Sequence, residues 1–378
     1  MALVQKQFGD LITFTRSSAG GRFNERGLFE MVPANQPRFD YDPVTKLPLG
    51  LLIEGSRTNL LLRSSNYSTL WAKNIVGDGK IPVVTPNTHV GPDGLMSAST
   101  IRLEVPDLRS QSTISQQFAT VDGQTYSGSI WIKANRPEDV GKQILMRHAG
   151  NVAFMTLTLT ENFKRAERTE VADRAVAVFQ LGLRPELGGS SGAVEFVAWE
   201  SQVEQGLFAT SNIPTTATQV TRTADAPTVN NLSPWFNPSE GTILLSAIPL
   251  QSALSLPSQF VCIDDGTLNN RMEVSQAAQS SGIRTQSNAG GKGVMDIVTG
   301  KISPGEIFKS ALAYKSGDYA VSVNGGTAIK GAGDVPTGLR LMVIGSRSSL
   351  GARQNCCIQS IRYYSRRLSN SELEALTK

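Results

Sequence analysis

Short runs of alternating residues, separated by tight-turn sequences, constrain the fold of this chain more than any other feature. In YSGSIWIKA, which begins at Tyr126, the positions of Tyr126, Gly128, Ile130 and Ile132 share one face of an extended strand, because successive residues point to opposite faces. Turn sequences such as VDG (121–123), RPED (136–139) and GGSSG (188–192) divide the runs from one another. No helical period lies between the runs. The sequence therefore predicts an all-β protein made of antiparallel β-sandwiches and not a parallel sheet with crossover helices.

Two series of such strands are separated by an extended segment rich in Thr, Ala and Pro, residues 209–229. The second series contains the hairpin sequence YKSGDYAVSVNGG (314–326), in which Ser-Gly-Asp and Asn-Gly are turn signals. Near the end of the chain, Ser369 and Glu372 have the spacing of a capping box, which predicts a short helix. The predicted domains are a short extended unit of residues 1–63, a jelly roll of residues 64–228 and a second sandwich of residues 229–378.

The first 63 residues differ in texture from the rest, with a proline or glycine every few positions. Strands in this stretch must be very short, so it has little core of its own. It is expected to become ordered against the next domain or against another chain. Because three chains wound about one axis could share its apolar side chains, we expect a homotrimer.

Within this stretch, Glu54 and Arg57 lie between two apolar triplets, 51–53 and 60–62, and the period fits neither a clean helix nor a clean strand. We expect the triplets to enter two different apolar layers, so that the segment joins the extended unit to the jelly roll. Gly55 would supply an unusual backbone angle at the bend.

A carboxylate and a guanidinium so placed are expected to be partly buried and therefore paired. Glu54 and Arg57 could pair with each other, or with Arg16 or Asp40 across a contact between chains. We interpret Glu54, Arg57, Arg16 and Asp40 as an assembly joint in preference to a catalytic site.

Charge and cysteine content exclude several classes of function. The formal net charge is +4, and only 18% of residues are charged, with Lys and Arg scattered. No basic stripe suited to nucleic acid is visible, and no apolar run reaches membrane-spanning length. The first residues lack the regions of a signal peptide, so we expect synthesis in a cytoplasm. Three cysteines, Cys262, Cys356 and Cys357, are too few for a disulfide framework and are expected to be small apolar residues in a sheet.

Support for catalysis is thin, and an enzyme is not expected. The sequence has no Gly-x-Ser-x-Gly elbow, phosphate-binding loop or His-x-x-x-His pair. Glycoside hydrolysis needs only two carboxylates, so Glu195 with Glu200, or Glu200 with Glu204, are candidate pairs. However, Glu200 and Glu204 on one face of a strand, with Trp199 on the other, are typical of an ordinary half-buried strand.

Candidate ligand-binding residues are few. Sugar sites stack an aromatic ring on the sugar, but Trp131 and Trp199 lie inside strands and are expected in a core, while Trp71 and Trp235 lie near domain entries and are expected in joints. The ligand-binding residues therefore stay unidentified.

The loop that contains Asp264, Asp265 and Asn269 could hold Ca²⁺. Asp-Asp-Gly is also a favourable turn sequence, and the turn is the preferred interpretation. No other cofactor is expected.

Three parts of the sequence resemble known families. LMVIGSR (341–347), followed by IQSIRYYSRRLSNSELEALT (358–377), resembles the end of a concanavalin A-like or laminin G-like sandwich. YSGSIWIKA (126–134) and the segment 198–227 resemble jelly-roll modules often classed as carbohydrate-binding. The opening, FTRSSAGGRFNERGLFEMVPANQPRFDYDP (14–43) leading into LGLLIEGSRTNLLLRSS, is similar to the first domain of many virion proteins of tailed phages.

This combination implies a virion fibre or spike, a tail fibre or receptor-binding protein that attaches the particle to the host surface through a glycan or a protein. The implied partners are two further copies of the chain and other virion proteins of the tail or head, and the implied location is the virion. Nucleic acid and membrane insertion are not implied. A purely structural decoration or connector protein is the alternative, and a surface-polysaccharide hydrolase is the third.

Overall fold

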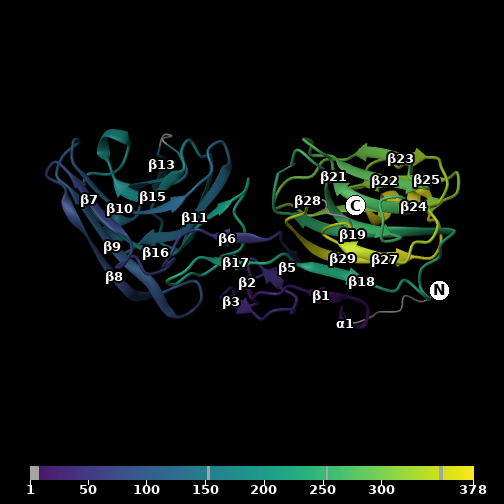
Figure 1. Cartoon of the computed structure of the whole chain (residues 1–378), viewed down its shortest axis with the longest axis horizontal. Coiled ribbons are helices and arrows are strands. Elements are labelled where there is room, and N and C mark those ends of the chain that lie inside the picture. Colours follow the sequence, from purple (N-terminus) through teal and green to yellow (C-terminus); the bar gives the residue numbers. More distant parts are fainter. Residues whose placement is uncertain (1–7, 151–153, 253, 349–351) are drawn as a thin grey trace. The chain divides into compact units, whose positions relative to one another are not determined.

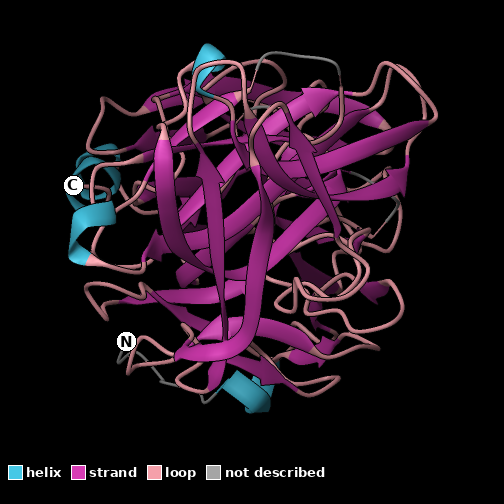
Figure 2. Cartoon of the chain, turned by 90° about the vertical axis from the view of Figure 1, so that its left-hand side faces the viewer, coloured by secondary structure: helices cyan, strands magenta, loops and turns pink. Residues whose placement is uncertain are grey.

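Strands make up almost all of the regular structure in the computed structural model, which describes residues 8–150, 154–252, 254–348 and 352–378 (Figures 1 and 2). The described strand pairings are antiparallel, apart from a short parallel pairing of β28 (Ala352–Arg353) with β20 (Ser258–Asp264). The predicted all-β class with antiparallel sandwiches is therefore confirmed. No helix among the described residues is long and apolar enough to span a membrane. The chain divides into two units, each described separately below.

The jelly-roll unit consists of residues 20–31 and 56–222. Two five-stranded sheets face each other, and two short ribbons complete the unit (Figure 1). The first sheet has the order β13 (Met155–Thr158), β12 (Gln143–Arg147), β15 (Val176–Leu183), β10 (Gln111–Ala119) and β7 (Ala72–Val76). The second has the order β14 (Lys164–Val171), β11 (Thr125–Ala134), β16 (Gly192–Gln205), β9 (Met96–Val105) and β8 (Lys80–Val90). The ribbons are β6 (Arg57–Asn59) with β17 (Val220–Arg222), and β2 (Gly20–Phe23) with β3 (Phe29–Val32); two 3₁₀ turns cover Pro137–Asp139 and Pro185–Leu187.

The core of this unit lies between the two five-stranded sheets. As the alternation predicted, Tyr126, Ile130 and Ile132 of β11 all belong to it, and they meet side chains such as Phe179 from the facing sheet. Leu61, from the second apolar triplet, is completely buried in the same cluster.

The outer face of the second sheet carries a smaller aromatic cluster, which the β2–β3 hairpin covers. Phe23 packs edge-on against Trp131 with ring centroids 5.5 Å apart, and Phe29 packs against Trp199 at 5.3 Å. Gly21 permits this approach, since a Cβ atom there would lie 2.3 Å from the Phe29 ring. The β2–β3 hairpin therefore covers an aromatic face of the sheet that the alternation of side chains alone would leave exposed to solvent.

The second unit, which we call the split sandwich, consists of the residues up to Ala19, residues 32–55 and residues 223–378. Its larger sheet has the order β1 (Thr13–Thr15), β18 (Ala226–Val229), β27 (Leu341–Ile344), β20, β21 (Arg271–Gln276), β22 (Ile283–Ala289) and β23 (Lys292–Thr299), with β28 beside β20. The facing sheet has the order β26 (Ile329–Gly331), β25 (Tyr319–Val323), β24 (Phe308–Lys315), β19 (Glu240–Pro249), β29 (Cys356–Tyr364), β5 (Pro48–Ile53) and β4 (Phe39–Tyr41). Its helices are α1 (Phe8–Leu11) and α2 (Asn370–Leu376).

Local signals in the second half of the chain are confirmed in this unit. Asn324 and Gly325 have positive φ angles of 49° and 73° at the end of β25, as an Asn-Gly turn requires. Ser369 caps α2 and forms the predicted capping box with Glu372, and Leu373 of the helix is buried. The three cysteines are buried as free thiols, as expected.

The first 63 residues are divided between the two units, which differs from the separate unit expected from the sequence. β1, β4 and β5 extend the sheets of the split sandwich, whereas β2, most of β3 and β6 belong to the jelly-roll unit. The physical reason is the poor core of this stretch, because its short strands bury their apolar side chains only by joining sheets that later residues build. Leu51 and Ile53 accordingly lie in the core of the split sandwich, so the two apolar triplets do enter different layers.

Candidate ligand-binding cleft

Glu54, the first residue of the expected joint, belongs to a buried network of charges within the split sandwich. Its carboxylate pairs with the guanidinium of Arg38 at 2.8 Å, and Arg38 also pairs with Asp225. Asp225 in turn accepts from Arg16 at 3.0 Å. The four side chains are at most 2% exposed, and together they carry two positive and two negative charges. This balance of charge makes their burial tolerable.

The geometry around Asp225 explains why the network is so well satisfied. One carboxylate oxygen accepts from Arg16, and the other accepts from Arg38 and from the backbone N–H of Glu54 at 2.9 Å. Arg16 also donates to the carbonyl oxygens of Ser18, Val32, Pro33 and Gln36.

Opposing effects act on the pKa values of the two arginines. Burial by itself lowers the pKa of Arg38, but the charges of Glu54 and Asp225 outweigh burial and raise this pKa above its ordinary value. For Arg16, burial dominates and lowers the pKa.

The four residues of the expected joint therefore occupy three places. Glu54 and Arg16 share the buried network through Asp225, and Asp40 is half-buried on β4, opposite Gly50 of β5. Arg57 lies in the jelly-roll unit, on β6. The assembly role of these residues stays a prediction. The unusual backbone angle was expected at Gly55, but it occurs at Gly50 of β5, which has a φ of 114°. Position 50 requires glycine for a second reason, since a Cβ atom there would lie 2.4 Å from the carbonyl oxygen of Ile358.

Arg38 and Asp225 were not singled out from the sequence. Each is a lone charged residue between apolar or small neighbours, in PRF and ADA respectively. That isolation is the signal that could have found them.

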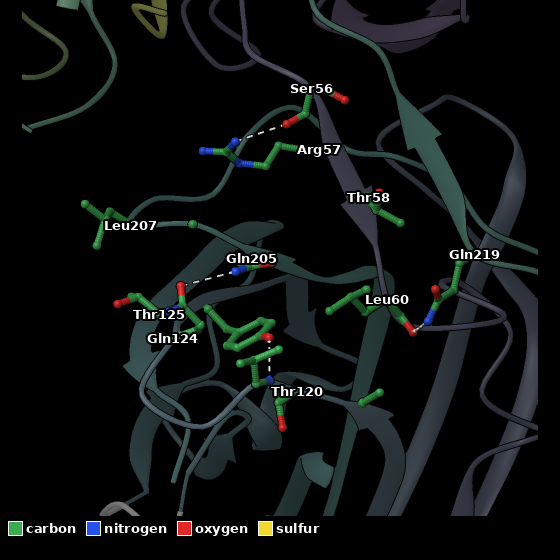
Figure 3. Close-up of a pocket in the computed structure, with 14 residues that line it drawn as sticks. Ser56, Arg57, Thr58, Leu60, Thr120, Gln124, Thr125, Gln205, Leu207 and Gln219 are labelled. Atoms are coloured by element: carbon green, nitrogen blue, oxygen red, sulfur yellow. Dashed lines mark hydrogen bonds between the residues drawn. The ribbon is translucent and has the colours of Figure 1, made fainter. Parts of the chain in front are cut away.

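Arg57 lines a cleft of about 790 Å³ in the jelly-roll unit (Figure 3). The cleft is bounded by β6, by the turn between β10 and β11, and by the segment after β16. Asn59 fixes β6 in this position, because its buried amide donates to the carbonyl oxygens of Ser201 and Ile213 and its oxygen accepts from Leu61 and Val203. The wall that carries Arg57 is therefore held rigidly against β16.

Neutral polar groups cover much of the cleft. The amide of Gln205 donates to Gln124 across 3.3 Å, and the amide of Gln219 donates to the carbonyl oxygen of Leu60 at 3.1 Å (Figure 3). These bonds leave the Gln205 oxygen and the Gln124 nitrogen without a partner among the described residues, so the cleft offers both an acceptor and a donor. Ser56 and Thr125 add hydroxyl groups to the lining.

Apolar side chains complete the lining. Leu207 is 54% exposed and Val121 is 59% exposed, although both are large apolar residues. Tyr126, by contrast, is buried, and its hydroxyl accepts from the Val121 N–H at 2.9 Å. The cleft thus combines hydrogen-bond donors and acceptors with a small apolar surface. This is the composition of a site for a polar ligand with an apolar face.

The other residues considered from the sequence lie elsewhere. Trp71, Trp131 and Trp199 are buried in the jelly-roll unit, and Trp235 packs against Tyr363 in the split sandwich. None of the four lines the cleft.

The three candidate carboxylates for hydrolysis are each engaged by protein donors. Glu195 accepts from Asn135, Glu200 from Ser65, and Glu204 from Thr210. Burial raises the pKa of Glu200 to about 7, and this residue has a positive φ of 48° within β16. No carboxylate is among the residues that line the cleft.

The candidate Ca²⁺ residues form turns closed by protein donors. Asp264 accepts from Gly266 and Ser348, and Asp265 accepts from Thr267 and Asn270. Asn269 contributes backbone groups, since its N–H donates to Thr267 and its carbonyl accepts from Gly291. Among the described residues no cluster of three or more His, Cys, Asp or Glu side chains could hold a metal ion. The geometry agrees with the preferred turn interpretation.

No family model matches this chain, and neither does any curated protein. Among solved structures, it is similar to the CBM40 domain of the Ruminococcus gnavus IT-sialidase bound to α2,3-sialyllactose, with 15% identity, 39% of this chain and 91% of that chain covered, and a TM-score of 0.33. It is also similar to domain 4 of a Geobacillus stearothermophilus arabinanase with arabinotriose, at 16% identity, 41% and 73% coverage and a TM-score of 0.35. A third similarity is to tailspike protein 4 of bacteriophage CBA120, at 12% identity, 38% and 21% coverage and a TM-score of 0.28. These scores are low, so function is argued from the residues of this chain.

Proposed function

We propose that this protein is a fibre or spike of a tailed-phage virion and that it attaches to the host surface by binding a saccharide in the cleft of the jelly-roll unit. The resemblance of residues 14–65 to the opening domain of phage virion proteins supports the location. The cleft supports the activity.

The observation that carries the proposal is the lining of the cleft. A sugar presents hydroxyl groups, which both donate and accept hydrogen bonds, around a ring with an apolar face. The unused Gln205 oxygen and Gln124 nitrogen match the first property, and exposed Leu207 and Val121 match the second. The wall that carries Arg57 is fixed through Asn59, so little ordering is needed on binding.

Competition with virions tests the attachment role. The purified chain should block adsorption of the phage to host cells and should bind polysaccharide extracted from those cells. The double variant Gln124→Ala/Gln205→Ala should lose most of both activities, because it removes the free donor and acceptor. Gln143→Ala, an exposed glutamine outside the cleft, is the matched control.

Each rival function predicts a different result. A structural decoration or connector would bind virion proteins, and it would leave adsorption unaffected at saturating concentration. A polysaccharide hydrolase would release reducing sugar from the extracted polysaccharide. The cleft supplies no carboxylate for that reaction, which favours binding over hydrolysis.

Trimeric assembly is part of the proposal. Light scattering at micromolar concentration should give three times the chain mass, and a monomer at that concentration contradicts this part alone.

A further inference from the structure

Arg57 is the one cationic side chain among the 14 residues that line the cleft, and no carboxylate accompanies it. Other arginines of the same unit, by contrast, have acidic partners. Arg165 and Arg168 of β14 form ion pairs with Glu167 and Glu170, and Arg222, which lies opposite Arg57 in the β6–β17 ribbon, has the buried Glu204 as its electrostatic partner. Arg57 forms no ion pair with any described residue.

The guanidinium of Arg57 is held in place while only one of its N–H groups is used in a hydrogen bond to a described residue. It lies over the Phe208 ring, 5.2 Å from the centroid, and close to the backbone of Gly206, where a Cβ atom would come within 2.8 Å of it. Its one hydrogen bond to a described residue runs from Nη1 to the carbonyl oxygen of Ser56 at 3.0 Å (Figure 3). Nε is buried and has no partner in the described structure. Nη2 and one N–H of Nη1 therefore stay available to a ligand.

Three features together select the ligand. A fixed guanidinium with free N–H groups recognises a carboxylate through charge-assisted, paired hydrogen bonds. The Gln124 and Gln205 amides are suited to hydroxyl groups, and the exposed Leu207 and Val121 are suited to the apolar face of a ring. We propose that the cleft binds an acidic saccharide, a sugar residue with a carboxylate that is held by Arg57, an inference that rests on the proposed function.

The charge of the site also limits the ligand. A single arginine with neutral neighbours matches one anionic group, whereas a polyphosphate backbone needs a row of cations. The cleft is therefore expected to select a sugar residue that carries one carboxylate flanked by hydroxyl groups.

The test uses the full chain and a panel of immobilised saccharides in four classes: neutral, carboxylate-bearing (uronic and nonulosonic acids), sulfated and phosphorylated. The strongest ligand is then measured again after chemical reduction of its carboxyl groups to alcohols. We expect the carboxylate class to bind best, and we expect reduction to weaken binding on the order of 10- to 100-fold.

Variants assign the effect to Arg57. Arg57→Gln should weaken binding of the acidic saccharide by a similar factor, and Arg57→Lys should fall between, since lysine keeps the charge but loses the planar fork. Arg109→Gln changes an exposed arginine that precedes β10, at the other end of that strand from the cleft, and should bind normally. Melting temperature and light scattering are recorded for every variant.

The outcomes separate this inference from the proposed function. Equal binding of neutral and reduced saccharides, or preference for sulfated or phosphorylated ones, overturns the acidic-sugar inference and leaves saccharide attachment standing. If no saccharide of the panel binds, both the acidic-sugar inference and the proposed saccharide attachment are contradicted. An Arg57→Gln variant that loses thermal stability or trimers while keeping wild-type affinity shows that Arg57 is only structural, which also overturns the inference.

Discussion

Replacement of Asp225 by asparagine is the sharpest test of the buried charge network. The change keeps the shape of the side chain and removes one negative charge, so Arg16 and Arg38 are left with Glu54 as the remaining carboxylate of the four. Both Asp225 oxygens accept hydrogen bonds, one from Arg16 and the other from Arg38 and the Glu54 N–H. An amide nitrogen in either place would face a donor, and the four side chains would carry one net positive charge in a buried site.

The expected cost follows from that net positive charge. Breaking a fully buried ion pair by removing one partner costs about 3–5 kcal/mol, because the surviving charge has no water to solvate it. The split sandwich has roughly 200 residues, and for a unit of that size each 1 kcal/mol lowers the melting temperature by about 2–4 °C. Asp225→Asn should therefore lower the melting temperature of the split sandwich by roughly 6–20 °C.

Differential scanning calorimetry can measure this effect, provided that the transitions of the two units are resolved. The matched control is Asp296→Asn, which breaks the exposed pair with Arg284 in the same unit and should cost at most about 1 kcal/mol. A melting temperature for Asp225→Asn within 2 °C of the control, by the same scale of about 2–4 °C per kcal/mol, would refute the argument that these charges are dehydrated and mutually dependent.

Three further predictions concern other features. Because burial raises the folded-state pKa of Glu200 from 4.5 to about 7, the native jelly-roll unit holds a proton that the unfolded chain has lost, so its stability should fall by about 3 kcal/mol as the pH rises from about 4.5 to 7. Denaturant titrations at pH 5 and pH 8 should show this fall in the free energy of unfolding of the wild type and a smaller fall for Glu200→Gln. An equal change in unfolding free energy for the two proteins would count against the prediction. Gly21→Val should destabilise the jelly-roll unit by about 1–3 kcal/mol, since the new side chain meets the Phe29 ring, whereas Gly293→Val, with open space around it, should be neutral in thermal melts. A fragment of residues 229–378, which lacks β1, β4, β5 and all of β18 except Val229, should unfold at lower denaturant concentration than the split sandwich in the full chain, and an unchanged midpoint would contradict the role of these strands.

The sequence predicted the β-sandwich class because alternation in strands such as β11 is a local property, and the Ser369 capping box and the Asn324 turn were visible for the same reason. It did not predict the division of the first 63 residues, since nothing local in β5 specifies that its partner is β29, some 300 positions later.

Sequence patterns did not reveal the cleft either. Gln124, Gln205 and Gln219 come from three separate segments, and none has a spacing that signals a site. Arg57 was noticed for its apolar neighbours and assigned to assembly, but its cleft is created by residues far along the chain. Sequence reasoning finds an isolated charge more readily than the surface on which it acts.

The interleaving of the two units has a consequence for synthesis on the ribosome. Every residue of the jelly-roll unit precedes Thr223, but β5 must wait for its partner strand β29. About 300 residues lie between these two strands, so their synthesis is roughly 15–60 s apart at about 5–20 residues per second. During that interval the nascent chain carries a strand, Leu51 to Ile53, whose sheet has not yet been made, and such strands are prone to pair with other chains. We expect ribosome-bound chains stopped after residue 222 and extended by a linker to contain a protease-resistant jelly-roll unit together with a cleavable segment around β5. Messages truncated late in the coding sequence should therefore yield aggregates and not a shorter folded protein.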